Sequence, residues 1–242
     1  MTGGQLLAVA LVVLVAAAAQ MVSGFGFALM AVPLMGLAID LKTAVVVCTI
    51  CGTASNTFQA MTDRGHRDSA LALRLILASL AGMPFGWLLL EAASNDQLRV
   101  VVGLTVLGAL VILSASRLSP DIGPVADVFA GVVSGALAIA TSTNGPPLVL
   151  LMRAKRLRPE VFRATINTVF SVVAVVSIVV FVSSGRVDSD VLKGAACAVP
   201  GLVFGIVAGQ RIRSRLNEAF FWRLVLVLLV GSAVASIASG LY

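Results

Sequence analysis

Charged residues are scarce in this chain of 242 residues. Asp, Glu, Lys and Arg make up 12% of it, whereas soluble domains carry about 25%. Hydrophobic residues make up 59%, and the mean hydropathy is +1.05. A surface with so few charges is not that of a soluble enzyme, a nucleic-acid-binding module or a disordered chain. The composition instead predicts an all-α polytopic membrane protein with about eight to ten membrane segments.

Residues that hold metals or perform acid–base chemistry are also rare. The chain has one histidine, His66, in a predicted loop, and its three cysteines lie in apolar stretches. Cys48 and Cys51 have no basic neighbours that would stabilise a thiolate. The P-loop pattern of nucleotide-binding proteins does not occur. We therefore expect no cofactor, no metal site, no direct use of ATP and no enzymatic activity.

Long apolar runs dominate the chain and predict helices, because they are too uniform for alternating barrel strands. The first run starts without a preceding Lys or Arg, so we expect a retained membrane helix rather than a signal peptide. The acidic residues fall near the ends of runs, and we expect nearly all of them to be solvated. The runs are Gln5–Val22, Phe25–Ile39, Thr43–Met61, Ala70–Leu90, Leu98–Ala115, Val125–Ala140, Pro146–Met152, Phe162–Val182, Val191–Gly209 and Phe220–Leu241.

Sequence features recur at an offset of about half the chain, which predicts two homologous repeats, 1–118 and 119–242, in one membrane domain. The matched pairs occur in the same order in both halves. They are Gly65–Ser69 with Gly185–Ser189, Arg74 with Lys193, Gly82–Gly86 with Gly201–Gly205, and Arg99–Val102 with Arg223–Leu226.

Each predicted repeat contains an apolar stretch interrupted by Gly or Pro. The first interruption is Gly24-Phe25-Gly26, and the second is Asn144-Gly145-Pro146-Pro147. Such interruptions at matching positions of two halves are a sequence sign of a transporter binding site. The alternative is that they are packing kinks whose backbone groups bond neighbouring helices.

The distribution of basic residues bears on topology. If each interrupted stretch is a single span, 11 basic residues face the cytoplasm and 6 face outside, and the repeats are parallel. If each is a hairpin that returns to its own side, the repeats are inverted, and the numbers become 13 and 4. The positive-inside rule favours the inverted arrangement with re-entrant hairpins. Both arrangements place the N- and C-termini outside.

Candidate substrate-binding residues cluster at the two interruptions and on the helices that follow them. Helix N-termini present unpaired N–H groups to anions, and glycines allow close approach. Asn56 and Asn167 serve either as ligand contacts or as interhelical bonds, and Arg74 and Lys193 either attract an anion or extend toward the interface. The candidates at the interruptions are Gln20, Ser23, Gly24, Phe25, Gly26, Ser142, Thr143, Asn144, Gly145, Pro146 and Pro147.

These motifs resemble the TauE/SafE family of sulfite and organosulfonate exporters. The resemblance covers nearly the whole chain and rests on the Gly24-Phe-Gly26 break with Pro33 downstream and on the Thr143–Pro147 break with its Leu-rich continuation. Phe25 and Phe27 stand where the family has smaller residues. The resemblance implies a carrier in the bacterial inner membrane that exports small sulfur-containing or organic anions, coupled to an ion gradient.

The sequence thus predicts a secondary transporter that holds a small anion between two repeats and works by alternating access. Because no acidic residue lies at the centre of an apolar run, proton coupling would run through the substrate or through water. A small-anion channel is the alternative, and an intramembrane enzyme would need a cluster of catalytic residues that the sequence does not display. The expected partners are the anion, the lipid bilayer and a coupled proton or other ion, without nucleic acid.

Overall fold

The computed structural model describes residues 1–114 and 123–213, and within them the chain is α-helical without strands, as predicted. Within these described ranges, six helices have the length and apolar composition to cross a membrane. The last predicted run, 220–241, and the Arg223–Leu226 match lie outside the described residues. The six helices are α1 (Gly3–Ser23), α3 (Leu41–Thr62), α4 (Ser69–Ala92), α6 (Pro124–Thr141), α8 (Pro159–Ser183) and α9 (Ser189–Arg213).

Two short helices follow the two interruptions. Helix α2 (Phe27–Met35) has 9 residues and α7 (Gly145–Ala154) has 10. At 1.5 Å per residue they are only about 15 Å long, half the thickness of a bilayer core. Helix α5 (Asn95–Ser114) and the short 3-10 helix η1 (Arg64–His66) complete the described elements.

Both broken segments fold back as hairpins. In the first, Gln5 near the start of α1 donates a hydrogen bond from Nε2 to the carbonyl oxygen of Ala38, just beyond α2, at 2.9 Å. In the second, Lys155 at the end of α7 places Nζ 2.8 Å from Oδ1 of Asp127 near the start of α6. Each short helix therefore returns to the side on which its long partner began.

Asp127 is an exception to the expectation that nearly all acidic residues near helix ends are solvated. Its side chain has 0% exposure, and Arg74 Nη2 lies 3.5 Å from Oδ2 in addition to the contact with Lys155. A buried carboxylate is stable only when it is paired, and here two cations from α4 and from the end of α7 neutralise it. The periodicity of one helix could not reveal these partners, because they come from other segments.

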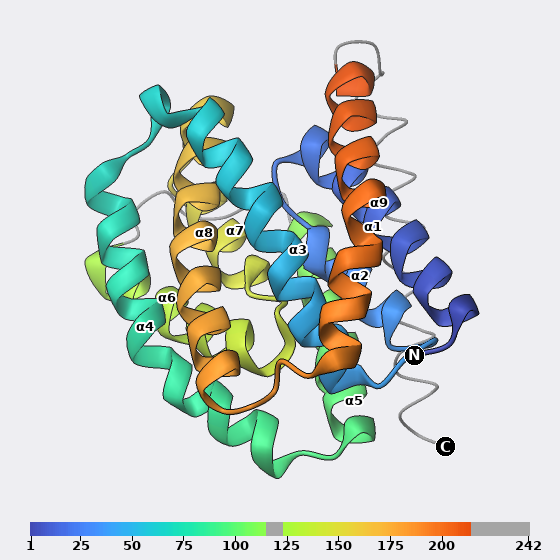
Figure 1. Ribbon diagram of the computed structural model, residues 1–242. Helices are drawn as coiled ribbons and strands as arrows, with labels where there is room; N and C mark the ends of the chain where they lie inside the picture. Colours follow the sequence, from blue (N-terminus) through green and yellow to red (C-terminus); the bar gives the residue numbers. More distant parts are fainter. Residues whose placement is uncertain (115–122, 214–242) are drawn as a thin grey trace.

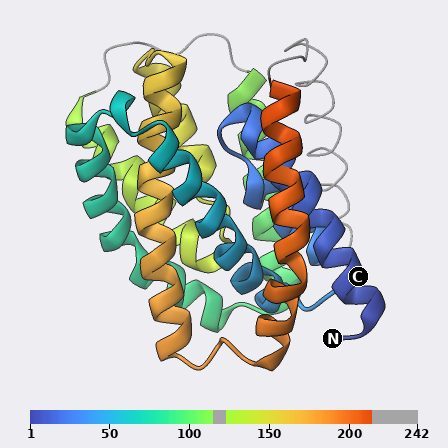
Figure 2. The same ribbon diagram turned by 45° about the horizontal axis from the view of Figure 1, so that its top comes forward.

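Helices from different halves pack as close pairs, α4 with α6 and α1 with α9, and they lie side by side in two views (Figures 1 and 2). A Cβ atom on Gly82 would overlap the carbonyl oxygen of Val132, and one on Gly86 that of Ala136. On α9, Gly201 and Gly205 meet the carbonyl oxygens of Ala10 and Leu14 in the same way. These glycines therefore form the surfaces along which the helices approach each other.

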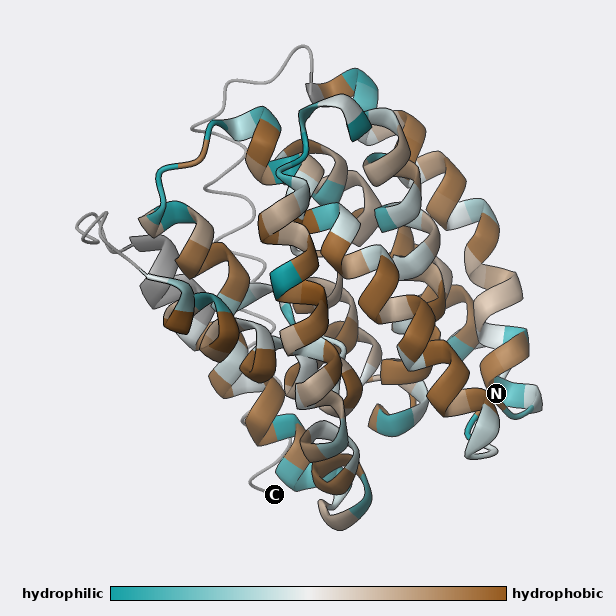
Figure 3. Ribbon diagram, turned by 90° about the vertical axis from the view of Figure 1, so that its left-hand side faces the viewer, coloured by the Kyte–Doolittle hydropathy of each residue, from teal (hydrophilic) through white to brown (hydrophobic). Residues whose placement is uncertain are grey.

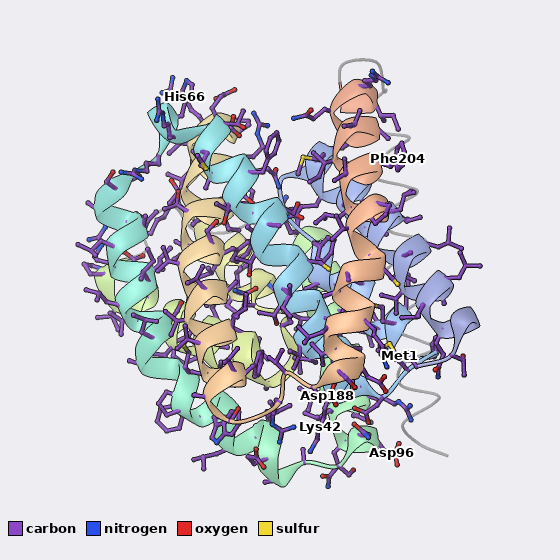
Figure 4. All side chains as sticks on the ribbon, in the orientation of Figure 1. Met1, Lys42, His66, Asp96, Asp188 and Phe204 are labelled. Carbon is purple, nitrogen blue, oxygen red and sulfur yellow. The ribbon has the colours of Figure 1, made fainter. Side chains whose placement is uncertain are left out.

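The molecule has two polar ends and an apolar middle. Hydrophilic residues concentrate at the helix ends and connecting segments, and brown, hydrophobic stretches dominate between them (Figure 3). Met1, Lys42, Asp96 and Asp188 lie toward one end, called here the Met1 end, and His66 lies at the other, the His66 end (Figure 4). Phe204 of α9 is 68% exposed and points outward from the bundle, as a lipid-facing side chain would.

Candidate functional site

The first break separates α1 from α2 by means of two glycines in left-handed conformations. Gly24 has φ +83° and Gly26 has φ +95°, a region that residues with a Cβ rarely adopt. A Cβ on Gly24 would also lie 2.6 Å from Cγ of Arg163 on α8, whereas the space beside Gly26 is open. Gly24 thus allows close packing, and Gly26 leaves room next to the first turn of α2.

The first turn of α2 presents free backbone donors. Within the described part of the chain, the N–H groups of Phe27, Ala28 and Leu29 have no acceptor, and no side chain caps this helix. These three residues line an internal cavity. Unpaired N–H groups and the partial positive charge of a helix N-terminus favour an anion at this position.

The second break has different chemistry. Ser142 ends α6 with φ +57°, and Asn144 precedes α7. Pro146 and Pro147 occupy the first turn of α7 and have no N–H to offer. Instead, this break supplies side chains: Ser142 accepts a hydrogen bond from Thr49 of α3 at 3.1 Å, and the Thr141 and Thr143 hydroxyls lie 2.6 Å apart.

Both breaks meet at a single cavity of about 40 Å³. A water molecule needs about 10–15 Å³ on the same measure, so the space suits a ligand of a few atoms. Residues of the two hairpins and of the middles of α3 and α8 line it. The lining residues are Gln20, Gly26, Phe27, Ala28, Leu29, Cys48, Thr49, Gly52, Asn56, Ala138, Ser142, Thr143, Asn144, Gly145, Phe170, Val173, Ala174 and Ser177.

None of these lining residues is charged, and their polar groups are amides, hydroxyls and a thiol. Gln20 donates from Nε2 to Oδ1 of Asn56 and accepts from the Ser55 hydroxyl at 2.7 Å. This network fixes the orientation of two amides at the cavity wall. The side-chain amide of Asn144 lines the cavity with no hydrogen-bond partner among the described residues, so it is available to a ligand.

Sequence reasoning placed seven of its candidates at this wall: Gln20, Gly26, Asn56, Ser142, Thr143, Asn144 and Gly145. Six others support the breaks without lining the cavity. Asn167 donates to the carbonyl oxygen of Gly24 at 3.0 Å, which is an interhelical bond. Ser23 bonds the Phe25 carbonyl at 2.6 Å, and Phe25 packs edge-on against Phe162 with ring centroids 6.1 Å apart. Gly24 packs against Arg163, while Pro146 and Pro147 shape the start of α7.

The two candidate cations lie away from the cavity. Arg74 is paired with Asp127 at the start of α6, and Lys193 lies 3.9 Å from Asp190 near the Met1 end with its side chain 60% exposed. Their matched positions in the sequence therefore do not bring them to a common site.

Several lining residues escaped sequence reasoning. Thr49, Phe170 and Ser177 sit in the middle of long apolar helices, where a hydroxyl or a ring looks like ordinary membrane sequence. Gly52 faces Phe27, with 3.3 Å from its Cβ position to that ring, and so admits α2 to the cavity. The spacing Thr49, Gly52, Asn56 does repeat on one face of α3, and that small polar stripe was a usable signal.

The arrangement is suited to binding rather than to bond-breaking. It offers neutral hydrogen-bond donors in a small cavity, and no carboxylate, imidazole or basic side chain stands among the lining residues. In the described ranges, no three His, Cys, Asp or Glu side chains gather as a metal site would require.

Comparisons with known proteins agree with this picture. Residues 9–236 match the family described as sulfite exporter TauE/SafE. A probable sulfite/organosulfonate exporter TauE of Cupriavidus necator is 26% identical over 221 residues, which cover 88% of this chain and 86% of that protein. No solved structure matches.

Proposed function

Because the chain belongs to the TauE/SafE family of membrane exporters, we propose that it carries sulfite or a small organosulfonate out across the bacterial inner membrane. The observation that supports this most directly is the meeting of both broken segments at one uncharged cavity. The chain is a multi-pass membrane transporter, and its substrate is a small anion.

The two sides of the cavity have complementary roles in this proposal. The N–H groups of Phe27, Ala28 and Leu29 hold the oxyanion on one side, where the α2 N-terminus adds a partial positive charge. Asn144 and the hydroxyls of the second break hold it on the other. A neutral site of this kind releases an anion more readily than one with a buried Lys or Arg, as a carrier requires.

The way the hairpins pack supports alternating access as the transport mechanism. The helix order of α1 to α4 is repeated in α6 to α9, and each half contributes a long helix, a short returning helix and two further long helices. We infer inverted repeats that move against each other around the cavity. Basic residues concentrate at the His66 end, which the positive-inside rule assigns to the cytoplasm, and both termini then lie outside.

A proton, if it is the coupled ion, would travel on the substrate or on water, because the cavity lining is uncharged. Sulfite flux into proteoliposomes should then respond to an imposed pH gradient. Flux that ignores both a pH and a sodium gradient would contradict coupled transport, and flux that does not saturate with sulfite would indicate a channel.

The test of the binding site measures the affinity of the purified protein for sulfite by calorimetry. Asn144→Ala should raise the Kd for sulfite about tenfold, because the substitution removes the side-chain amide from the cavity wall. Asn95→Ala, at the Met1 end, should leave the Kd unchanged. An unchanged Kd in Asn144→Ala would place the substrate elsewhere.

A further inference from the structure

A second polar cluster lies one helical turn from the cavity, toward the His66 end. Gln59 of α3 is 5% exposed, and in the described part of the chain neither its Nε2 nor its Oε1 has a hydrogen-bond partner. Leaving a buried amide without hydrogen bonds is unfavourable, so such side chains usually face a ligand or water.

Helix periodicity shows what Gln59 faces. It follows Ser55 by four residues and Asn56 by three, so it lies on the same side of α3. Both Ser55 and Asn56 bond Gln20 near the end of α1. One turn further along both helices, Gln59 is therefore level with Gly24 at the first break.

Helix α8 places polar side chains at the same height in the bundle as Gly24. Asn167 donates to the Gly24 carbonyl, while its Oδ1 is buried and has no partner among the described residues. Arg163, one turn earlier, lays its side chain over Gly24, with Cγ 2.6 Å from the Cβ position there. Thr165 accepts a hydrogen bond from the Asp68 N–H at 3.0 Å, which ties this part of α8 to the His66 end.

The order of these groups defines a path. On α3 the cavity residue Asn56 is followed by Gln59, and on α8 the cavity residue Phe170 is preceded by Asn167 and then by Arg163. Each step is about one turn, or about 5 Å. Polarity and positive charge thus increase from the neutral cavity toward the His66 end. This end carries η1 and the side chains of Arg64 and Arg67.

We propose that Gln59 and Arg163, positioned beside Asn167, form a second anion-binding subsite that the oxyanion occupies between the His66 end and the central cavity. The guanidinium attracts the anion, and the Gln59 Nε2 donates a hydrogen bond as water is removed. This rests on the proposed transport of a small oxyanion, but it adds a site on one side of the cavity only.

Because the subsite lies on one side of the cavity, its loss should affect transport from one side of the membrane only. Sulfite transport is measured in right-side-out and inside-out membrane vesicles with Gln59→Met, which keeps the shape of the side chain and removes its polar atoms. We expect KM to rise at least fivefold for sulfite presented at the His66 end and less than twofold for sulfite presented at the Met1 end. Gln97→Met, an exposed site on α5, is the matched control and should change neither.

The outcomes separate the hypotheses. An equal rise from both sides would make Gln59 a structural residue, and no rise would make its pocket a water site; either result overturns the proposal. If Gln59→Met does not fold, Arg163→Gln is measured in the same way, and it should raise KM on the same side and weaken its dependence on ionic strength. If the central site itself is misassigned, Asn144→Ala will leave sulfite binding intact, whatever Gln59 does.

Discussion

In the first half of the molecule the hairpin turns on glycine and closes with a neutral hydrogen bond, whereas in the second half it turns on Ser142 and Asn144 and closes with buried charges. Gln5 meets a carbonyl oxygen in one, and Asp127 meets Lys155 and Arg74 in the other. The first break offers backbone N–H groups to the cavity, and the second, with its two prolines, offers side chains. Two segments of similar outline thus supply the two kinds of donor that surround an oxyanion.

The two breaks have different roles in substrate binding under the proposed function. The glycine turn brings the backbone of α2 to the cavity, and substitutions of side chains do not easily alter backbone N–H groups. A turn of polar side chains is open to substitution, so we expect the second break to set substrate preference and the first to provide affinity for any oxyanion.

The largest effect should come from the charged closure of the second hairpin. Asp127→Ala leaves Lys155 and Arg74 without their shared carboxylate, and we expect the free energy of unfolding in detergent to fall by about 3 kcal/mol. Denaturant unfolding measures it. The double variant Asp127→Ala/Lys155→Ala should lose less than the sum of the single variants, because that sum counts the attraction between Asp127 and Lys155 twice. If the losses of the two single variants add up to that of the double variant, Asp127 and Lys155 do not stabilise each other.

The close helix pair α4–α6 should be more sensitive to added bulk than the pair α1–α9. A Cβ on Gly135 would overlap the Ser79 carbonyl oxygen, whereas on Gly209 the nearest atoms lie at 2.6 Å. We expect Gly135→Ala to lower the free energy of unfolding by about 2 kcal/mol, and Gly209→Ala to lower it by about 1 kcal/mol. Gly108→Ala, which meets nothing within 4 Å, serves as the control in thermal unfolding. A larger loss of stability for Gly209→Ala would show that the α1–α9 pair is the more sensitive of the two.

Making the first break resemble the second tests the role of its backbone. Ala28→Pro removes one N–H donor from the first turn of α2, a position in which α7 already accommodates proline. We expect the Kd for sulfite to rise about tenfold, as for loss of one hydrogen bond to a charged group. Ala28→Ser keeps the N–H and should bind more tightly than the proline variant. Equal affinities, measured by calorimetry, would exclude this donor from the site.

The smallest effect is expected at the neutral closure of the first hairpin. Gln5→Leu removes the hydrogen bond to the Ala38 carbonyl, and we expect a loss of about 1 kcal/mol in the same unfolding measurement. A loss as large as that of Asp127→Ala would mean that the two closures are equivalent in spite of their chemistry.

The positions of the helices and of both breaks could be predicted because glycine, proline and long apolar runs act locally. Asn144 and Asn56 could also be predicted as candidates, because amide side chains stand out in an apolar sequence. The pairing of Asp127 with Lys155 was not, because it depends on α7 folding back along α6. Gln59 and Ser177 were missed because their significance depends on which face of a helix meets which neighbour.

The crossed packing of the halves has a consequence for synthesis. Helix α1 lies against α9, yet about 170 residues of chain separate the end of one from the start of the other. At 5–20 residues per second, the ribosome needs about 10–35 s to supply the partner. During that interval the surface around Ala10, Leu14 and Ala18 faces lipid or a membrane chaperone. An isolated first half should therefore insert into the membrane but remain without the neighbour that α1 requires, until a separately expressed second half arrives.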